Sequence, residues 1–203
     1  MGDAIRIALW NANGLIQRRN ELEIFLHTEK IDIILVSETH FTNKSYFSIP
    51  NYKCYSTQYP DDTAHGGTAM LITKSILHHE LEKYEKSFIQ ATSNNITSNN
   101  GSKDSSSVLF YIILFNIFSN DSAVHYHISK STIFSYLRPR RIFIKNLFIF
   151  CPPRHSISKE QFSSFFETLG PKFLAGGNFN AKHTNWGSRL ITPKWRSFFN
   201  SII

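Results

Sequence analysis

Three short polar segments carry the side chains best suited to chemistry on phosphate. They are Asn11–Asn13, Glu38–His40 and Asn178–Asn180, and each directly follows an apolar run. Carboxylate oxygens bind hard cations such as Mg²⁺, while amide and imidazole groups can hydrogen-bond to phosphate. In α/β architectures, ligands bind at the carboxyl ends of the strands. Three such loops therefore predict one shared site for phosphate handling.

Glu38 is the best single candidate for a metal ligand among these residues. A carboxylate at a strand end suits Mg²⁺, which keeps several waters and bridges to phosphate. Taken alone, such an acid is more often a surface residue or the start of a helix. Asn11 and Asn13 could orient a phosphate or a metal-bound water, but asparagine-rich loops are also ordinary turns. The combination of loops is more specific than any one member.

The segment Phe173–His183 has the form of an active-site loop. Its apolar start leads into Gly176 and Gly177, which allow the backbone to turn sharply and to approach a ligand. Asn178 and Asn180 follow, and alternate residues of an extended chain project to the same side. The pattern predicts two amides that face one ligand.

Histidines add weaker candidates. His40, His65 and His183 lie in loops and could act as general acids or phosphate contacts, although scattered loop histidines are usually just solvated. His125 and His127 have a spacing that could ligate a metal from one strand face, but nothing else in that region supports a site.

Apolar patterns predict the elements that must position these loops. Strands are predicted at Ile5–Trp10, Ile31–Ser37, Tyr52–Thr57, Gly67–Thr73, Ile142–Phe150 and Lys172–Ala175. Helices are predicted over Gln17–Glu29, from the capping box Ser158–Gln161 to Gly170, and from Thr192 onward. Ile31–Ser37 is almost continuously apolar, which favours a central strand covered on both faces.

The middle of the chain departs from this regularity. Residues 93–107 form a low-complexity polar tract, for which a flexible loop is expected. Residues 108–149 mix aromatic runs with Ser, His and the basic cluster Arg138–Arg141, without a sustained period of 2 or 3.6. No element is predicted there before Ile142.

Length and charge bound the class of protein. A chain of 203 residues with 41% hydrophobic content fits one globular domain. The net charge of +7 is uneven, because residues 1–90 carry 9 Lys/Arg against 11 Asp/Glu, residues 91–150 carry 6 against 2, and residues 151–203 carry 7 against 2. A basic half suggests a polyanionic partner, most often nucleic acid, with an ordinary basic surface as the alternative.

Cysteine usage and hydropathy bear on the compartment. Cys54 and Cys151 are far apart, so neither a zinc cluster nor a disulfide framework is indicated, and a reducing compartment is expected. The N-terminus lacks the plan of a signal peptide, and the longest apolar run, Val108–Phe118, is too short to span a bilayer. An intracellular protein without a membrane partner is expected.

Six ordered blocks of sequence together resemble a known family. They are Trp10–Gly14, Ser37–Thr42, Ile49–Tyr52, Gly66–Ala69, Cys151–Arg154, and Gly176–His183 with Trp186–Ser188. In this order they resemble the endonuclease domain of jockey-like non-LTR retrotransposons. That domain is a member of the endonuclease/exonuclease/phosphatase superfamily and is akin to apurinic/apyrimidinic endonucleases. The resemblance covers about residues 4–92 and 150–197.

The resemblance implies a four-layered α/β sandwich of two mixed sheets with outer helices. It also implies a Mg²⁺-dependent enzyme that nicks DNA, next to the reverse transcriptase domain of the parent element. Carried over by position, Asn11 would contact the scissile phosphate, and Asn13 and Glu38 would lie at the metal. Asn180 would hold the phosphate oxygen or the partner of the nucleophile. His40, Lys182 and His183 are the expected substrate contacts.

Three departures from the family pattern bear on activity. Asn178 stands where the family has Asp, and an amide cannot accept the proton of the attacking water. Phe150 stands where the family has an active-site Tyr, which removes a hydroxyl that would face the phosphate. The family pattern continues to a Ser-Asp-His-type motif beyond Ile203, which implies a sandwich incomplete at its C-terminal end. Residues 93–149 do not resemble the family and are interpreted as an inserted or frame-disrupted segment.

The sequence thus favours a monomeric DNA endonuclease domain, impaired in this copy and nuclear if functional. A nucleic-acid-binding remnant without catalysis is the first alternative. A phosphatase of the same superfamily ranks below it, because the matching blocks are those of the transposon branch.

Overall fold

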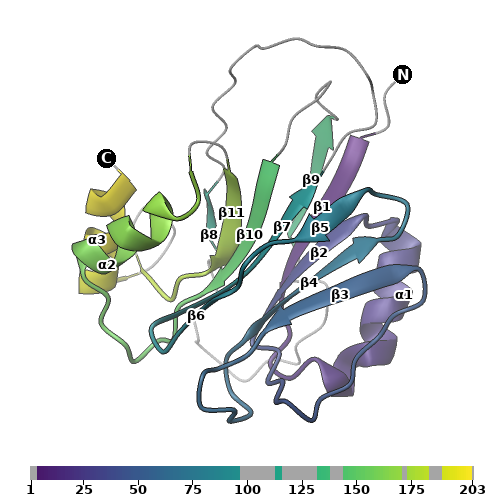
Figure 1. The fold of residues 1–203 in the computed structure, drawn as a ribbon, viewed down its shortest axis with the longest axis horizontal. Helices are drawn as coiled ribbons and strands as arrows, with labels where there is room; N and C mark the ends of the chain where they lie inside the picture. The colour runs from purple at the N-terminus through teal and green to yellow at the C-terminus, as the bar shows by residue number, and fades with distance from the viewer. Residues whose placement is uncertain are drawn as a thin grey trace.

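Two mixed β-sheets lie face to face, and helices cover the outer face of each sheet (Figure 1). The computed structural model describes residues 4–96, 113–115, 132–137, 144–170, 173–182 and 189–202. The four layers run in the order α1, first sheet, second sheet, and α2 with α3. This is the four-layered α/β sandwich that the resemblance implies.

The first sheet has the strand order β3-β4-β2-β1-β9. Its strands are β1 (Ala4–Asn11), β2 (Ile33–Ser37), β3 (Tyr52–Thr57), β4 (Thr68–Thr73) and β9 (Thr132–Leu137). The central pair, β1 and β2, is parallel, whereas the other neighbours are antiparallel. Consequently β1 and β2 end at the same edge of the sheet.

The second sheet has the order β5-β7-β10-β11-β8, with β6 also paired to β7. Its strands are β5 (His78–Glu80), β6 (Tyr84–Lys86), β7 (Ile89–Ile96), β8 (Ile113–Phe115), β10 (Ile144–Phe150) and β11 (Phe173–Asn178). Strands β10 and β11 are parallel, as are β11 and β8. This sheet therefore also has a parallel centre whose strands end together.

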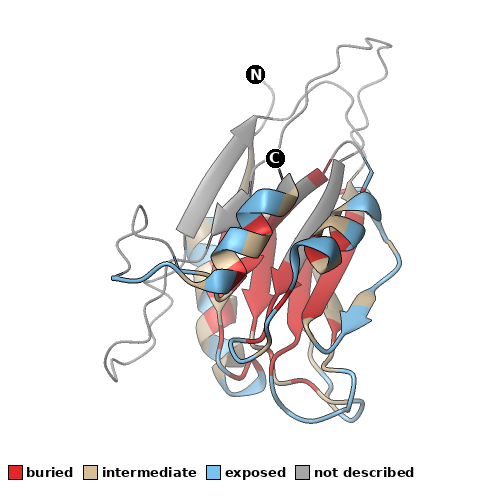
Figure 2. Ribbon diagram, turned by 90° about the vertical axis from the view of Figure 1, so that its left-hand side faces the viewer, coloured by how far each residue is buried: buried red, intermediate tan, exposed pale blue. Residues whose placement is uncertain are grey.

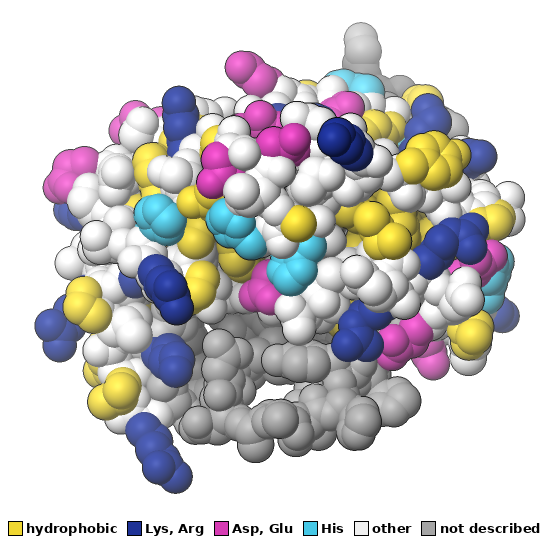
Figure 3. Space-filling model, turned by 90° about the horizontal axis from the view of Figure 1, so that it is seen from below, with side chains coloured by type: hydrophobic (Ala, Val, Ile, Leu, Met, Phe, Trp, Pro, Cys, Tyr) yellow, Lys and Arg dark blue, Asp and Glu magenta, His cyan; other side chains and the backbone are white. Residues whose placement is uncertain are grey.

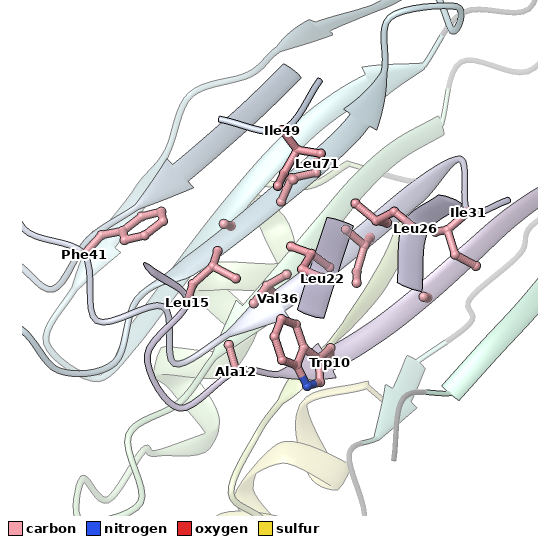
Figure 4. Close-up of a cluster of buried hydrophobic side chains, with 13 residues drawn as sticks. Trp10, Ala12, Leu15, Leu22, Leu26, Ile31, Val36, Phe41, Ile49 and Leu71 are labelled. Atoms are coloured by element: carbon pink, nitrogen blue, oxygen red, sulfur yellow. The ribbon is translucent and has the colours of Figure 1, made fainter. Parts of the chain in front are cut away.

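Alternate residues of β2 pack against different layers of the sandwich. Ile34 and Val36 join the cluster beneath α1 (Arg19–Glu29), where Leu22 and Leu26 supply the helix side (Figure 4). Ile33 and Leu35 instead belong to the cluster between the sheets. All five residues of β2 are buried. The predicted central strand is confirmed, and burial on both faces fits its continuous apolar run.

Aromatic packing fixes the helices on the second sheet. The capping box of α2 (Lys159–Glu167) is present, because Gln161 N donates to Ser158 Oγ at 3.3 Å and Ser158 N donates to Gln161 Oε1 at 2.9 Å. Phe162 of α2 meets Phe198 of α3 (Pro193–Ile202) edge-on, with ring centroids 5.4 Å apart. Figure 2 shows the result, with buried strands inside and the outer faces of these helices exposed.

One expectation about the polar tract is wrong. Residues 93–96 of the tract, expected to be a flexible loop over residues 93–107, are instead the end of β7, which continues to Ile96 and buries Ser93 and Asn94. Residues 97–107 lie outside the described part of the chain. Two polar side chains of β7 have partners on the facing sheet, since Thr92 Oγ1 donates to Thr57 Oγ1 at 2.8 Å and Asn94 Nδ2 donates to Met70 Sδ at 3.5 Å. A polar seam between sheets lacks the apolar pattern that predicts a buried strand.

Strands β5, β6, β8 and β9 were likewise not predicted. The first two are three-residue strands with mostly polar residues, and such short strands carry little periodic signal.

None of the described helices is long and apolar enough to cross a bilayer.

Candidate active site

The loops after β1 and β2 are joined by backbone hydrogen bonds that continue the pairing of the two strands. Ala12 N donates to Ser37 O at 3.0 Å, Gly14 N to Glu38 O at 2.8 Å and Leu15 N to Thr39 O at 3.0 Å. Asn11 is the register partner of Ser37. The two predicted loops are therefore brought together as one backbone unit.

The loop before β4 extends this unit on its other side. His40 N donates to Gly66 O at 3.0 Å, and Thr39 N approaches Gly67 O at 3.4 Å. An ideal Cβ at Gly67, whose φ is +76°, would lie 2.8 Å from Thr39 Oγ1. Only glycine allows this close approach, so the Gly66–Gly67 block serves to hold the Glu38 loop.

Asn178, at the end of β11, reaches across to the first sheet. Its Nδ2 donates to Glu38 Oε1 at 3.3 Å. The other amide atom, Oδ1, accepts the backbone N–H of Asn180 at 3.0 Å. That second bond sets the orientation of the amide, so Asn178 presents its NH₂ group and not its oxygen to the carboxylate.

Asn180 has a different partner from Asn178. Its Nδ2 donates to Cys151 O at 2.9 Å, and Cys151 N donates to Asn178 O at 2.9 Å. The alternation expected along this segment ends at Asn178, because β11 ends there and Asn180 has φ +47°. Asn180 thus ties the end of β11 to the loop after β10.

Gly177 of β11 also acts differently from the expectation. An ideal Cβ at Gly177 would lie 2.0 Å from Ile149 O of the neighbouring strand β10. Gly177 is therefore required for the close approach of two strands, rather than for the approach of a ligand.

Asn11 and Asn13 form a local turn. Asn13 N donates to Asn11 Oδ1 at 3.1 Å, and Asn13 is exposed. Asn11 lies at the strand end beside the Glu38 loop. Within the described part of the chain, no hydrogen bond links the Asn13 side chain to Glu38.

His40 lies on the Glu38 loop, half-buried against the turn after β1. Its Nδ1 is 3.6 Å from the position that a Cβ on Gly14 would take. Burial lowers the pKa of His40, and His65 lowers it further, while the nearby charge of Glu38 opposes the change. His65 packs on Tyr59 with ring centroids 3.9 Å apart and contacts Thr63 Oγ1 through Nδ1. His40 therefore lies near Glu38, and His65 lies near His40.

Of the two remaining predicted substrate contacts, Lys182 and His183, the structure describes only Lys182. Lys182 is exposed, and its backbone is anchored to the start of α3: its N donates to Thr192 Oγ1 and its O accepts from Thr192 N, both at 3.0 Å. His183 lies outside the described residues. Lys182 thus has an anchored backbone and an exposed side chain two positions after Asn180.

Phe150, at the position of the family Tyr, is buried at 3% exposure. It is the register partner of Gln90 on β7, so both side chains lie on one face of the sheet. Both also lie against Gly66, where an added Cβ would be 2.8 Å from Phe150 Cε1 and 3.4 Å from Gln90 Oε1. Gln90 Oε1 is buried and accepts no hydrogen bond from any described residue.

Lys194 supports the site and was not predicted. Its side chain is buried, and Nζ donates to Pro152 O at 2.6 Å, which holds the loop after β10 against α3. Burial lowers the pKa of Lys194. A lysine in the first turn of a helix gives no sequence signal for this role, since most such lysines are solvated.

Four residues of the site have a left-handed backbone. The φ angles are +45° for Asn13, +54° for Glu38, +56° for His40 and +47° for Asn180. Asparagine tolerates this region, but for glutamate it costs about 1–2 kcal/mol. Strain of this kind concentrates at functional sites, where the surrounding structure holds it in place.

The donor set fits a weakly held Mg²⁺ ion. Among the described residues, no group of three His, Cys, Asp or Glu side chains could enclose a metal. Mg²⁺ needs only one or two carboxylates when waters and phosphate oxygens complete its shell. Glu38 supplies one carboxylate, and none of the described hydrogen bonds engages its Oε2. From below, histidine and acidic side chains meet near the middle of the face, with lysine and arginine on both sides (Figure 3).

Comparisons with known proteins identify the family of this chain. The model of the endonuclease/exonuclease/phosphatase family matches residues 8–200. The RNA-directed DNA polymerase from mobile element jockey of Drosophila melanogaster is 28% identical over 193 residues, which are 94% of this chain and 16% of that protein. The corresponding protein of Drosophila funebris is 27% identical over 91% of this chain, again 16% of its own length. The chain thus spans about a sixth of these relatives.

Solved structures confirm the fold. The endonuclease domain of TRAS1, a telomere-specific non-LTR retrotransposon, superposes with a TM-score of 0.60 at 16% identity, over 98% of this chain and 71% of that one. The AP endonuclease LMAP from Leishmania major gives a TM-score of 0.57 at 10% identity, over 98% and 66% of the two chains. The resemblance to jockey-like retrotransposon proteins is confirmed, and the chain belongs to the endonuclease/exonuclease/phosphatase family.

Proposed function

We propose that the chain is a Mg²⁺-dependent DNA endonuclease domain of a non-LTR retrotransposon, which hydrolyses a phosphodiester bond. The observation that carries the proposal is the bridge between Glu38 and Asn178, at 3.3 Å, which joins the strand ends of both sheets into one polar site. The family match and the jockey relatives support phosphodiester chemistry and a DNA partner. A nuclear location and a neighbouring reverse transcriptase domain belong to the same proposal.

The residues of the site would divide the binding of the cation and of the DNA among them. Glu38 would hold the cation, with Asn13 as a second ligand from the adjacent loop. When bound, the cation would stabilise the charge that develops on the phosphate oxygens. Asn11 and His40 would hold the scissile phosphate, and Lys182 would contact the DNA backbone. Asn180 stays oriented by its bond to Cys151 O and would face the attacked phosphate.

The amide of Asn178 makes phosphodiester hydrolysis by this chain slow. An amide cannot take the proton of the attacking water, and loss of a general base lowers a rate by about 10²- to 10⁴-fold. Here the amide also turns its NH₂ group toward Glu38, as a donor where the family pattern has an acceptor. Phe150 removes a second polar group, since its ring offers no hydrogen bond to phosphate.

Nicking of supercoiled plasmid in MgCl₂ tests the proposal. We expect slow conversion to the open circle by the wild-type chain, and a rate at least tenfold higher for Asn178→Asp. Glu38→Ala should abolish the conversion in both backgrounds. The matched control is Glu85→Ala on β6, which removes an exposed carboxylate outside the site. Nicking that survives Glu38→Ala, or that proceeds fully in EDTA, would contradict the proposed role of Glu38.

A second candidate is a DNA-binding remnant without catalysis. Asn178 in place of a carboxylate favours it, as does the excess of 7 Lys/Arg over 2 Asp/Glu in residues 151–203. In this case binding of a DNA duplex should weaken steeply as the salt concentration rises, because bound phosphates release counterions. No variant at Glu38 or Asn178 should then change the plasmid.

A further inference from the structure

The hydrogen bond between Asn178 and Glu38 also bears on the stability of the fold. Glu38 is held in a left-handed conformation at φ +54°, only partly exposed, at the edge where the two sheets meet. Its carboxylate oxygen Oε1 accepts the amide of Asn178 at 3.3 Å. A hydrogen bond to an ionised acceptor is about twice as strong as one between neutral groups. One carboxylate oxygen of Glu38 therefore already has a hydrogen-bond donor from this chain.

A carboxylate in place of the amide would reverse this interaction. The N–H of Asn180 would still bind one oxygen of the residue at position 178, as it binds Asn178 Oδ1 at 3.0 Å. The second oxygen would then face Glu38 Oε1 where Nδ2 now lies. Two like charges at hydrogen-bond distance repel, and either a proton taken up by one carboxylate or a cation bound between the two offsets that repulsion.

We infer that Asn178 holds Glu38 in place without a cation, so that folding of this chain is independent of Mg²⁺. The amide does for the fold what a bound cation does between two carboxylates. It joins the end of β2 to the end of β11, and so fastens one sheet to the other at the site. Asn178 is a positioning residue in this sense, and a single substitution should make the stability of the chain depend on a divalent cation.

This inference shares with the proposed function only the premise that a divalent cation belongs at Glu38. Its readout is thermal stability and needs no substrate. A chain that cuts no DNA can therefore still confirm it, and a chain that nicks DNA can still contradict it.

The experiment compares melting temperatures of the full chain in EDTA and in 5 mM MgCl₂, with NaCl adjusted to equal ionic strength because salt also screens charges. Because the wild-type site holds the cation only weakly, the wild-type melting temperature should change by less than about 1 °C between the two buffers. Asn178→Asp should melt about 5–10 °C lower in EDTA and recover at least half of that loss in MgCl₂.

The matched control is the double variant Asn178→Asp with Glu38→Gln. It keeps the new carboxylate and removes the charge that opposes it. In EDTA it should melt above Asn178→Asp, and MgCl₂ should not stabilise it. An Asn178→Asp chain as stable as the wild type in EDTA would overturn the inference, and so would equal stabilisation of wild type and variant by MgCl₂.

Asn178→Ala covers the case in which Asn178→Asp does not fold. Alanine removes the donor and adds no charge. Its loss of melting temperature should fall by at least half in the Glu38→Gln background, because the missing hydrogen bond no longer ends on a charge. Equal losses in both backgrounds would show that Asn178 does not hold Glu38.

Discussion

The amide nitrogen of Asn178 lies 3.3 Å from Oε1 of Glu38, although 140 positions separate the two residues in the chain. Glu38 follows a strand of the first sheet, and Asn178 ends a strand of the second. The site consequently exists only when the two sheets are packed together. Substitutions that disturb either strand end should act on stability and on the site at once.

Gly177→Ala should be among the most disruptive small substitutions. The added Cβ would lie 2.0 Å from Ile149 O, and a backbone atom cannot move aside without distorting β10. We expect a loss of about 3 kcal/mol or more in the free energy of unfolding, measured in urea. Gly170→Ala is the control, because no atom lies within 4 Å of its Cβ and only its φ of +73° opposes alanine, at about 1 kcal/mol. Equal losses would show that the close strand approach is not the cause.

Asn180→Ala should lower the free energy of unfolding more than Asn180→Gly does. Both variants lose the bond from Nδ2 to Cys151 O, which costs about 1 kcal/mol. Alanine also opposes the φ of +47°, whereas glycine accepts it. After allowance for the greater freedom of glycine in the unfolded chain, Asn180→Ala should be less stable by about 1 kcal/mol in urea. The reverse order would contradict the left-handed conformation of Asn180.

His40 should contribute to acid instability. Burial lowers its pKa below the ordinary value of 6.5, so the unfolded chain takes up a proton first as the pH falls. The stability from His40 is present above pH 6.5 and is lost as the pH falls through the lowered pKa. His40→Asn, which keeps a residue tolerant of φ +56°, should therefore flatten the dependence of unfolding free energy on pH between 5 and 7.

His27→Asn is the matched control, because His27 is exposed on α1. An unchanged slope in His40→Asn, or an equal change in both variants, would show that His40 does not titrate in this way.

Cys151 should be inert in the folded protein. Burial raises the pKa of its thiol from 9.0 to about 12, so at pH 8 the thiolate fraction falls by roughly a thousandfold. Iodoacetamide should modify Cys151 only after unfolding in urea, as peptide mass spectrometry would show. Rapid modification of the native chain would contradict its burial.

The raised pKa of Cys151 also makes the stability of the chain depend on pH. The folded chain keeps the thiol proton of Cys151 above pH 9.0, where the unfolded chain loses it, so this contribution to stability falls as the pH rises toward 12.

Phe150→Tyr should be tolerated because an acceptor already lies in its pocket. Gln90 Oε1 is buried without a described donor, and Gln90 faces Phe150 across the strand pair. We expect the new hydroxyl to leave the free energy of unfolding unchanged or to raise it by about 1 kcal/mol. In a Gln90→Leu background the hydroxyl has no such acceptor, and the same change should cost about 1–3 kcal/mol. Equal effects in both backgrounds would exclude Gln90 as the partner.

The sequence predicted the elements with a strong apolar period. Strand β3 was predicted with its observed bounds, and β2 only two residues too long, because burial on both faces produces an unbroken apolar run. The capping box at Ser158 located the start of α2, since its two side chains bond locally. These signals come from residues close together in the sequence, so they can be recognised without knowledge of the rest of the fold.

The features that the sequence did not predict depend on distant partners. The polar end of β7 is a buried strand only because Thr92 meets Thr57 on the opposite sheet. Lys194 is buried only because its ammonium group meets the carbonyl oxygen of Pro152. The loops that the sequence singled out lie together in the structure. The direction of the Asn178 amide was not predicted, because it is set by a backbone N–H two residues later.

The backbone bonds that join Ala12, Gly14 and Leu15 to residues 37–39 carry the hydrogen-bond ladder of the sheet past the ends of its strands. Opening these loops thus requires separation of β1 from β2, and their amide protons should exchange with solvent no faster than those of the central strands. A substrate would meet this edge already formed. The conformational entropy that a mobile loop loses on binding has here been lost during folding.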